Sequence, residues 1–223
     1  MKKLNFTYAG IDFNFFDDTP FAIEAVAQEI MNKEYPLESY LFDEGDVVID
    51  IGSHVGIISI ILAKLNPELT IYAFEPLPSN FSMLLKNIEE NNISNIKPFQ
   101  MAVTEVSGRQ VYLYDRTEEL KNSGGASLFT PNPHRTLVDT ISLDDIFKRH
   151  HIKECNLLKI DCEGSEYDIL LNSNKFQSGA VKQLLGEFHT NEYLSSKEYT
   201  MEKLLAFCNQ HVPGEVKVKF CTI

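Results

Sequence analysis

The stretch "DVVIDIGSHVGIIS" (residues 46–59) reads as a buried strand that turns through two glycines into the apolar first turns of a helix. Glycine suits such a turn because it has no side chain to obstruct a sharp bend or the close approach of a ligand. The spacing D-x-G-x-x-x-G, from Asp50 through Gly52 to Gly56, differs from the G-x-G-x-x-G of dinucleotide sites, and His54 stands where that pattern needs its second glycine. The turn predicts a nucleotide-like ligand and disfavours a pyrophosphate.

Short apolar runs alternate with helical patterns from about residue 46 onward, which is typical of crossover units in a mainly parallel sheet. The expected strands are Val47–Ile51, Thr70–Phe74, Ile96–Ala102, Asn156–Ile160 and Gln183–Phe188. Helices are expected to begin near Val55, Pro78, Ser142, Ser165 and Lys197. The sequence therefore predicts an α/β fold.

Two segments fall outside this alternation. Residues 1–44 predict a hairpin followed by a short helix, and the segment between Arg109 and Asp139 predicts an inserted pair of short antiparallel strands around a long loop. We expect one domain over residues 1–223, with 1–44 as an extension and 45–223 as the ligand-binding catalytic core.

Composition limits the possible partners. A formal net charge of −12 argues against nucleic acid, because there is no general basic surface to neutralise phosphates. The longest apolar run, "VGIISIILA", is too short to cross a bilayer, so membrane insertion is not expected. The four cysteines include no C-x-x-C pair, which favours reduced thiols and a cytoplasmic location. A small-molecule or glycan partner is the expectation.

A carboxylate at the end of the following strand, Glu75 in "YAFEP", lies where it can accept hydrogen bonds from both hydroxyls of a ribose. Together with the glycine turn it resembles the S-adenosylmethionine site of class I methyltransferases. "LLKIDCEGSEYDIL" (residues 157–170) resembles the K-I-D-x-E-G-x-E segment of the FkbM family of methyltransferases. "GDVVIDIGSHVG", "FEPLPSNF", "GGASLF" and "DTISLDDI" match as well, so the resemblance runs from about Leu41 to His189.

The resemblance implies a Rossmann-like class I methyltransferase fold, with a mostly parallel seven-stranded sheet and helices on both of its faces. It also implies S-adenosylmethionine as methyl donor and S-adenosylhomocysteine as product. The family usually carries Asn at position 54. The residues that the resemblance assigns to the donor site are Asp50, Gly52, His54, Val55, Gly56, Glu75, Pro76, Met101, Ala102 and Ser127.

Four residues are candidates for the chemistry of methyl transfer, which needs a positioned nucleophile and a group that takes its proton. They are Asp161, Glu163, Glu166 and His189. Crowded carboxylates repel one another, so we expect one of them to have a raised pKa or a cation partner. A divalent metal held by Asp161, Glu163, Glu187 and His189 is an alternative, but it is not favoured because the sequence has no compact ligand motif.

The leading hypothesis is an S-adenosylmethionine-dependent O-methyltransferase that acts on a hydroxyl of a sugar, a surface-glycan precursor or a secondary metabolite. The alternatives are a NAD-binding oxidoreductase, against which the missing middle glycine argues, and a catalytically silent binding protein, against which the acidic cluster argues. The acceptor and the oligomeric state are left open.

Overall fold

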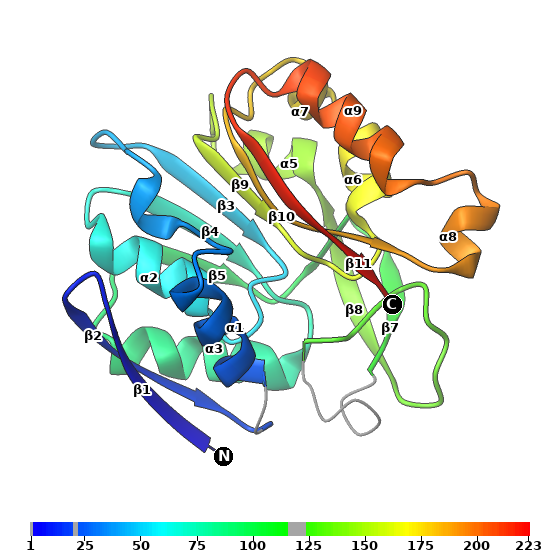
Figure 1. Ribbon diagram of the computed structural model, residues 1–223. Coiled ribbons are helices and arrows are strands. Elements are labelled where there is room, and N and C mark those ends of the chain that lie inside the picture. The colour runs from blue at the N-terminus through cyan, green and yellow to red at the C-terminus, as the bar shows by residue number, and fades with distance from the viewer. Residues whose placement is uncertain (1, 20–21, 116–123) are drawn as a thin grey trace.

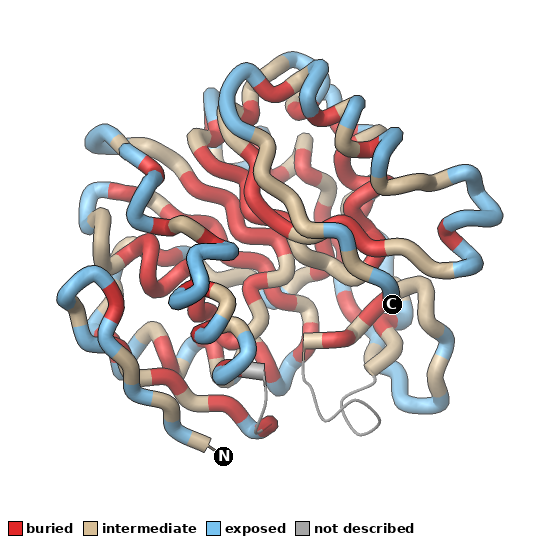
Figure 2. The backbone as a smooth tube through the Cα atoms, viewed as in Figure 1, coloured by how far each residue is buried: buried red, intermediate tan, exposed pale blue. Residues whose placement is uncertain are grey.

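Six parallel strands form the central sheet of the computed structural model, which describes residues 2–19, 22–115 and 124–223. Their order is β11-β10-β9-β3-β4-β5, and every neighbouring pair is parallel (Figure 1). The strands are β3 (Val47–Ile51), β4 (Thr70–Phe74), β5 (Ile96–Phe99), β9 (Leu157–Ile160), β10 (Leu184–Thr190) and β11 (Val216–Thr222). Strands β3, β4 and β9 are almost entirely buried, as their apolar runs predict (Figure 2).

Helices cover both faces of this sheet. Side chains along each strand point alternately to the two faces, so each face has its own apolar core. On β3, Ile49 and Ile51 pack in one apolar core, with α5 (Leu143–Arg149), α6 (Glu166–Leu171), α7 (Asn174–Gln177) and α9 (Met201–His211). Val48 packs in the other core, with α1 (Ala22–Met31), α2 (Ile57–Leu65) and α3 (Pro78–Glu90). The predicted α/β class is confirmed. Within the described ranges, no helix has both the length and the apolar character that crossing a membrane requires.

The strand count differs from the predicted seven. The segment expected as one strand over Ile96–Ala102 divides into β5 and β6 (Ala102–Thr104), and β6 joins β8 (Arg135–Ser142) and β7 (Gln110–Tyr114) in a separate three-stranded sheet. Pro98 lies in β5 and has no N–H to donate to a further strand, which suits an edge position. Strand β11 is not among the predicted strands, although its V-K-V-K alternation has the period of a half-buried strand.

The N-terminal hairpin, β1 (Lys2–Tyr8) with β2 (Ile11–Asp17), is joined to α3 by two asparagine side chains. The Asn87 amide accepts from the Phe16 N–H at 2.7 Å and donates to the carbonyls of Phe16 at 3.0 Å and Val55 at 2.8 Å. Asn91 accepts from the N–H of Asn14 at 3.1 Å and donates to its carbonyl at 2.6 Å. Asn87 therefore holds both the hairpin and the turn that follows β3.

Replacing Asn87 by alanine should lower the free energy of unfolding by about 3 kcal/mol, because it leaves buried backbone groups without hydrogen bonds. Urea unfolding followed by circular dichroism measures the loss. Asn172→Ala is the matched control, because that amide is exposed and bonds only to the carbonyl of Asp168 in the preceding turn. It should change stability by less than about 0.5 kcal/mol. Equal losses in the two variants would contradict the role of Asn87.

Candidate functional site

A cavity of about 230 Å³ opens where the carboxyl ends of β3, β4, β9 and β10 meet, the edge at which α/β sheets bind ligands. The predicted site residues that line it are Gly52, His54, Glu75, Pro76, Met101, Ala102, Asp161 and Glu163. The predicted residues that do not line it are Asp50, Val55, Gly56, Ser127, Glu166 and His189. The structure therefore brings the two sequence motifs to one cavity, with several residues acting from behind its wall.

The two glycines of the turn after β3 are required by the protein's own packing. Gly52 has a φ of +76°, and a Cβ there would overlap the backbone carbonyl of Asp161. Gly56 has a φ of +89°, and a Cβ there would overlap the side chain of Leu84 on α3. The close approach inferred from the sequence is thus between Gly52 and the loop after β9, and it places the turn after β3 directly beside Asp161.

A buried ammonium group lies beneath this contact. Lys159 of β9 is the register partner of Asp50 on β3, and its Nζ lies 3.2 Å from Asp50 Oδ1. Lys159 also donates to the Gly52 carbonyl at 2.6 Å and lies 3.9 Å from Asp161 Oδ2. Burial acts to lower the pKa of Lys159, but Asp50 and Asp161 outweigh it and raise that pKa above its usual value. Asp50 also accepts a hydrogen bond from the Ser59 hydroxyl at 2.6 Å. Asp50 therefore supports the cavity wall indirectly, by pairing with Lys159.

Glu75 is buried at the end of β4 and keeps both carboxyl oxygens near backbone donors. It accepts from the N–H of His54 at 2.9 Å and from the N–H of Leu77 at 2.9 Å. Burial raises the pKa of Glu75 to about 7, against the lowering effect of these hydrogen bonds. The Asn80 amide also donates to Oε1 at 3.4 Å, so the capacity that remains for a ligand hydroxyl is chiefly on Oε2.

The hydroxyl group of Ser53 marks the same wall as a ligand site. Ser53 lines the cavity and is 5% exposed, yet its Oγ has no hydrogen-bond partner among the described residues. A buried hydroxyl without a partner is costly unless a ligand or a water satisfies it. Ser53 is not among the site residues predicted from the sequence, although it lies inside the D-x-G-x-x-x-G turn.

His54 adopts a left-handed backbone conformation, with a φ of +52°. Histidine and asparagine enter this region more readily than most other residues with a side chain do. Burial lowers the pKa of His54 to about 4, so the imidazole is neutral at physiological pH. The side chain lines the cavity as an uncharged polar group.

The acidic cluster after β9 is built around a buried carboxylate, Glu166. Glu166 accepts from the N–H groups of Cys162 and Gly164, both at 3.0 Å, and from His189 Nδ1 at 2.9 Å. With no exposed surface, Glu166 shapes the loop and orients His189 rather than contacting a ligand. Ser127 stabilises the same loop by donating to the carbonyl of Glu163.

The opposite nitrogen of His189 faces three carboxylates. Its Nε2 lies 3.8 Å from Asp161 Oδ1, 3.9 Å from Glu163 Oε1 and 3.9 Å from Glu187 Oε2. Burial would lower the pKa of His189, but Glu166, Asp161 and Glu163 raise it to about 10. Burial raises the pKa of Glu163 to about 8 and also raises that of Asp161, although Lys159 and His189 act against the second shift.

The N-terminal extension completes the wall that faces this cluster, and no sequence motif indicated this. Tyr35 and Glu29 line the cavity together with Ala25 and Val26 of α1. The Tyr35 hydroxyl donates to Glu187 Oε1 at 2.7 Å, across 152 residues of sequence. Burial raises the pKa of Tyr35 well above its usual value, so it remains a hydrogen-bond donor.

Comparison with known proteins adds independent evidence. Residues 50–211 match the sequence profile of the family described as "Methyltransferase FkbM domain". Methyltransferase 1 of Beauveria bassiana is 29% identical over 146 residues, which cover 58% of this chain and 59% of that protein. The 31-O-demethyl-FK506 methyltransferase FkbM of Streptomyces tacrolimicus is 26% identical over 172 residues, covering 65% of this chain and 66% of that protein.

A third relative, the hexuronic acid methyltransferase AglP of Haloferax volcanii, is 26% identical over 148 residues that cover 66% of this chain and 57% of that protein. The chain thus spans less than two thirds of the length of each of these relatives. The match includes both the turn after β3 and the acidic cluster, but not residues 1–49.

Gly52→Ala should lower the free energy of unfolding by about 3 kcal/mol or more, because the new Cβ adds a clash with the Asp161 carbonyl to a strained φ. Gly45→Ala is the matched control, since Gly45 has a similar φ of +87° and a Cβ there would meet nothing within 4 Å. It should lose only about 1 kcal/mol. Thermal unfolding of both variants measures the difference, and a loss in Gly52→Ala no larger than that of Gly45→Ala would refute the packing role.

Glu75 gives a pH dependence of stability with a defined sign. The pKa of Glu75 in the folded chain, about 7, exceeds the ordinary 4.5. The stability that the protonated carboxyl group contributes is therefore fully present below about pH 4.5 and is lost as the pH rises through 7. Relative to Glu75→Gln, the wild type should lose about 3 kcal/mol of unfolding free energy between pH 4.5 and pH 8. Urea unfolding across that range tests this. The control variant Glu68→Gln, which changes an exposed carboxylate, should have the same stability as the wild type at every pH. If the stability of Glu75→Gln varied with pH as that of the wild type does, the raised pKa of Glu75 would be contradicted.

Proposed function

Because the chain belongs to the FkbM family of methyltransferases, we propose that it transfers the methyl group of S-adenosylmethionine to a hydroxyl group of a small molecule or glycan precursor. The observation that carries the proposal is the joining of a polar ligand wall and an acidic cluster in one cavity at the carboxyl edge of the sheet. An oxidoreductase that uses NAD loses its support, because the family is one of methyltransferases and His54 replaces the middle glycine of a pyrophosphate site.

The chemistry of the wall fits the donor. Ser53 offers a buried hydroxyl without a partner among the described residues, and Glu75 offers carboxyl oxygens for ribose hydroxyls. Pro76, Met101 and Ala102 give the neighbouring wall an apolar surface suited to an adenine ring. When bound, S-adenosylmethionine supplies an electrophilic methyl group on a sulfonium. Asp50, Val55 and Gly56 contribute by shaping the turn behind this wall rather than by touching the donor.

The chain's own part in the transfer is to orient the acceptor hydroxyl and to take its proton. Asp161 lines the cavity at the end of β9, and Lys159 and His189 lie 3.9 Å and 3.8 Å from its two carboxyl oxygens. We assign the proton to Asp161, with Glu163 beside it as a second carboxyl group that faces the acceptor. Glu166 and His189 act as positioning residues, because Glu166 fixes the imidazole and the imidazole acts on the charge of Asp161 from 3.8 Å.

The relatives suggest the class of acceptor. One is named for the methylation of a hexuronic acid and another for the methylation of 31-O-demethyl-FK506. A hydroxyl of a sugar, a surface-glycan precursor or a secondary metabolite is accordingly the acceptor proposed for this chain. The carboxylates and the Tyr35 hydroxyl at the acceptor side suit a polyhydroxylated ligand, since they offer both acceptors and a donor.

Asp161→Asn should keep donor binding and lose methyl transfer by about 100-fold or more, because the amide cannot take the hydroxyl proton. Calorimetric titration with S-adenosylmethionine and with NADH measures binding. Transfer of labelled methyl groups to sugars, sugar nucleotides and phosphorylated sugars measures turnover. The matched control is Asp139→Asn, an exposed carboxylate on β8 bonded to Gln110, which should behave as the wild type.

The outcomes separate the parts of the proposal. Unchanged turnover in Asp161→Asn would remove Asp161 from the chemistry and leave the donor site standing. Binding of NADH without binding of S-adenosylmethionine would overturn the proposed function as a whole.

A further inference from the structure

We propose that Asp161, Glu163 and His189 form a binding site for one divalent cation of the Mn²⁺ or Mg²⁺ class, on the acceptor side of the cavity. The sequence leaves such a site open but does not favour it, because its residues are not arranged in a compact motif. In the folded chain, one potential ligand atom from each of the three residues lies within 4.8 Å of the other two. The inference goes beyond the proposed function, since cation binding can be measured without donor or acceptor.

The distances around His189 Nε2 are those of groups that face one another across a gap. At 3.8 to 3.9 Å from the nearest oxygens of Asp161 and Glu163, the nitrogen is too far away for a hydrogen bond. Two ligands on one cation with bonds of about 2.1 Å lie about 3.0 Å apart when adjacent and about 4.2 Å apart when opposite. The two separations from His189 fall between these values, and the two carboxylates lie within 4.8 Å of each other, so the spacing of the three groups suits one shared ion.

The imidazole is prepared for this role by its other nitrogen. His189 is 2% exposed, and its Nδ1 lies 2.9 Å from Glu166 Oε1. A proton on Nδ1 that is shared with a carboxylate fixes the ring toward the metal, the arrangement found behind most metal-bound histidines, and the cation would take the place of the proton on Nε2. Glu166 is held in turn by two backbone N–H groups, so the ring has a rigid support.

The second possible ligand set, which combines Glu187, His189 and Cys221, is less suitable. Glu187 already accepts from Tyr35 at 2.7 Å and from Cys221 Sγ at 2.9 Å, and Lys219 lies 3.4 Å from it. Glu187 lines the cavity as Asp161 and Glu163 do, but these hydrogen bonds and the ion pair with Lys219 already occupy its carboxyl oxygens. A set of two carboxylates and one imidazole favours Mn²⁺ or Mg²⁺ over the softer metals that thiolates select.

Such a cation would balance the excess of carboxylates and would bind an acceptor hydroxyl beside the donor wall, which lowers the pKa of that hydroxyl. The protein would leave several coordination positions of the ion open. Two neighbouring hydroxyls of a sugar could occupy two of them, and so could a hydroxyl and a carboxylate of a sugar acid. The location of the site therefore favours acceptors with two adjacent oxygen groups.

The test uses the whole chain, treated with a chelator and then desalted, with Mn²⁺ alone as the probe. Electron paramagnetic resonance of unbound Mn²⁺ should show one saturable site per chain, and Mg²⁺ should compete for it. Glu163→Gln should weaken Mn²⁺ binding about tenfold or more, and Glu163→Asp, which keeps the charge, should weaken it less. Mn²⁺ should also raise the thermal unfolding midpoint of the wild type more than that of Glu163→Gln.

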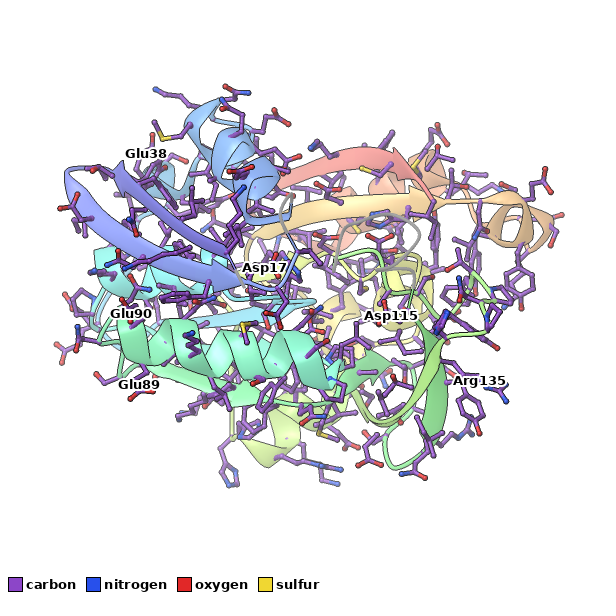
Figure 3. The ribbon with its side chains drawn as sticks, turned by 90° about the horizontal axis from the view of Figure 1, so that it is seen from below. Asp17, Glu38, Glu89, Glu90, Asp115 and Arg135 are labelled. Atoms are coloured by element: carbon purple, nitrogen blue, oxygen red, sulfur yellow. The ribbon has the colours of Figure 1, made fainter. Side chains whose placement is uncertain are left out.

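Two controls fix the location. Glu89→Gln removes an exposed carboxylate of α3 (Figure 3), and Cys221→Ser removes the thiol of the second ligand set; both should bind Mn²⁺ as the wild type does. Non-saturable binding, equal affinity in the wild type and Glu163→Gln, or loss of binding only in Cys221→Ser would overturn the proposal. These experiments contain neither methyl donor nor acceptor. A result that overturns the cation site would therefore not contradict the methyl-transfer proposal, which the Asp161→Asn experiment tests separately.

Discussion

The buried ammonium group of Lys159 is the interaction on which the rest of the site depends. Moving a charge of this kind out of water costs several kcal/mol unless its partners are well placed. Lys159 has three partners, and they come from different parts of the chain: the carboxylate of Asp50, the carbonyl of Gly52 and the carboxylate of Asp161. The ion pair thereby ties β3 to β9 at the edge of the sheet where the cavity opens. It also fixes the direction of the turn after β3.

This arrangement joins the turn after β3 and the acidic cluster through direct contacts. Gly52 packs directly on the backbone of Asp161, and Lys159 joins both residues from below. A displacement of the turn would therefore displace the candidate catalytic carboxylate with it. In-line methyl transfer depends on holding two reactants in register, so a shared foundation for both sides of the cavity is a physical advantage.

The sequence was most informative where the structure is local. The bounds of β3 and β4 follow directly from their apolar runs, and the glycine turn and the K-I-D-x-E-G-x-E segment indicated the family that the profile match confirms. Sequence reasoning placed Asp50 in the donor site and Glu166 among the catalytic residues; in the structure both are buried and neither lines the cavity. Whether a carboxylate at a strand end faces a cavity or a neighbouring strand depends on register and on distant residues. The spacing of a motif does not specify either.

The cavity wall is built by residues from two parts of the chain. The matched residues 50–211 hold the donor wall and the acidic cluster, whereas Tyr35 and Glu29 belong to the segment that precedes them. Within the described residues of the N-terminal extension (2–19 and 22–44), no strand joins the parallel sheet. Substitutions at Tyr35 or Glu29 would therefore change the wall of the cavity while the ion pair between Lys159 and Asp50 stays intact. The shape of the cavity and the stability of the sheet edge thus depend on different parts of the chain.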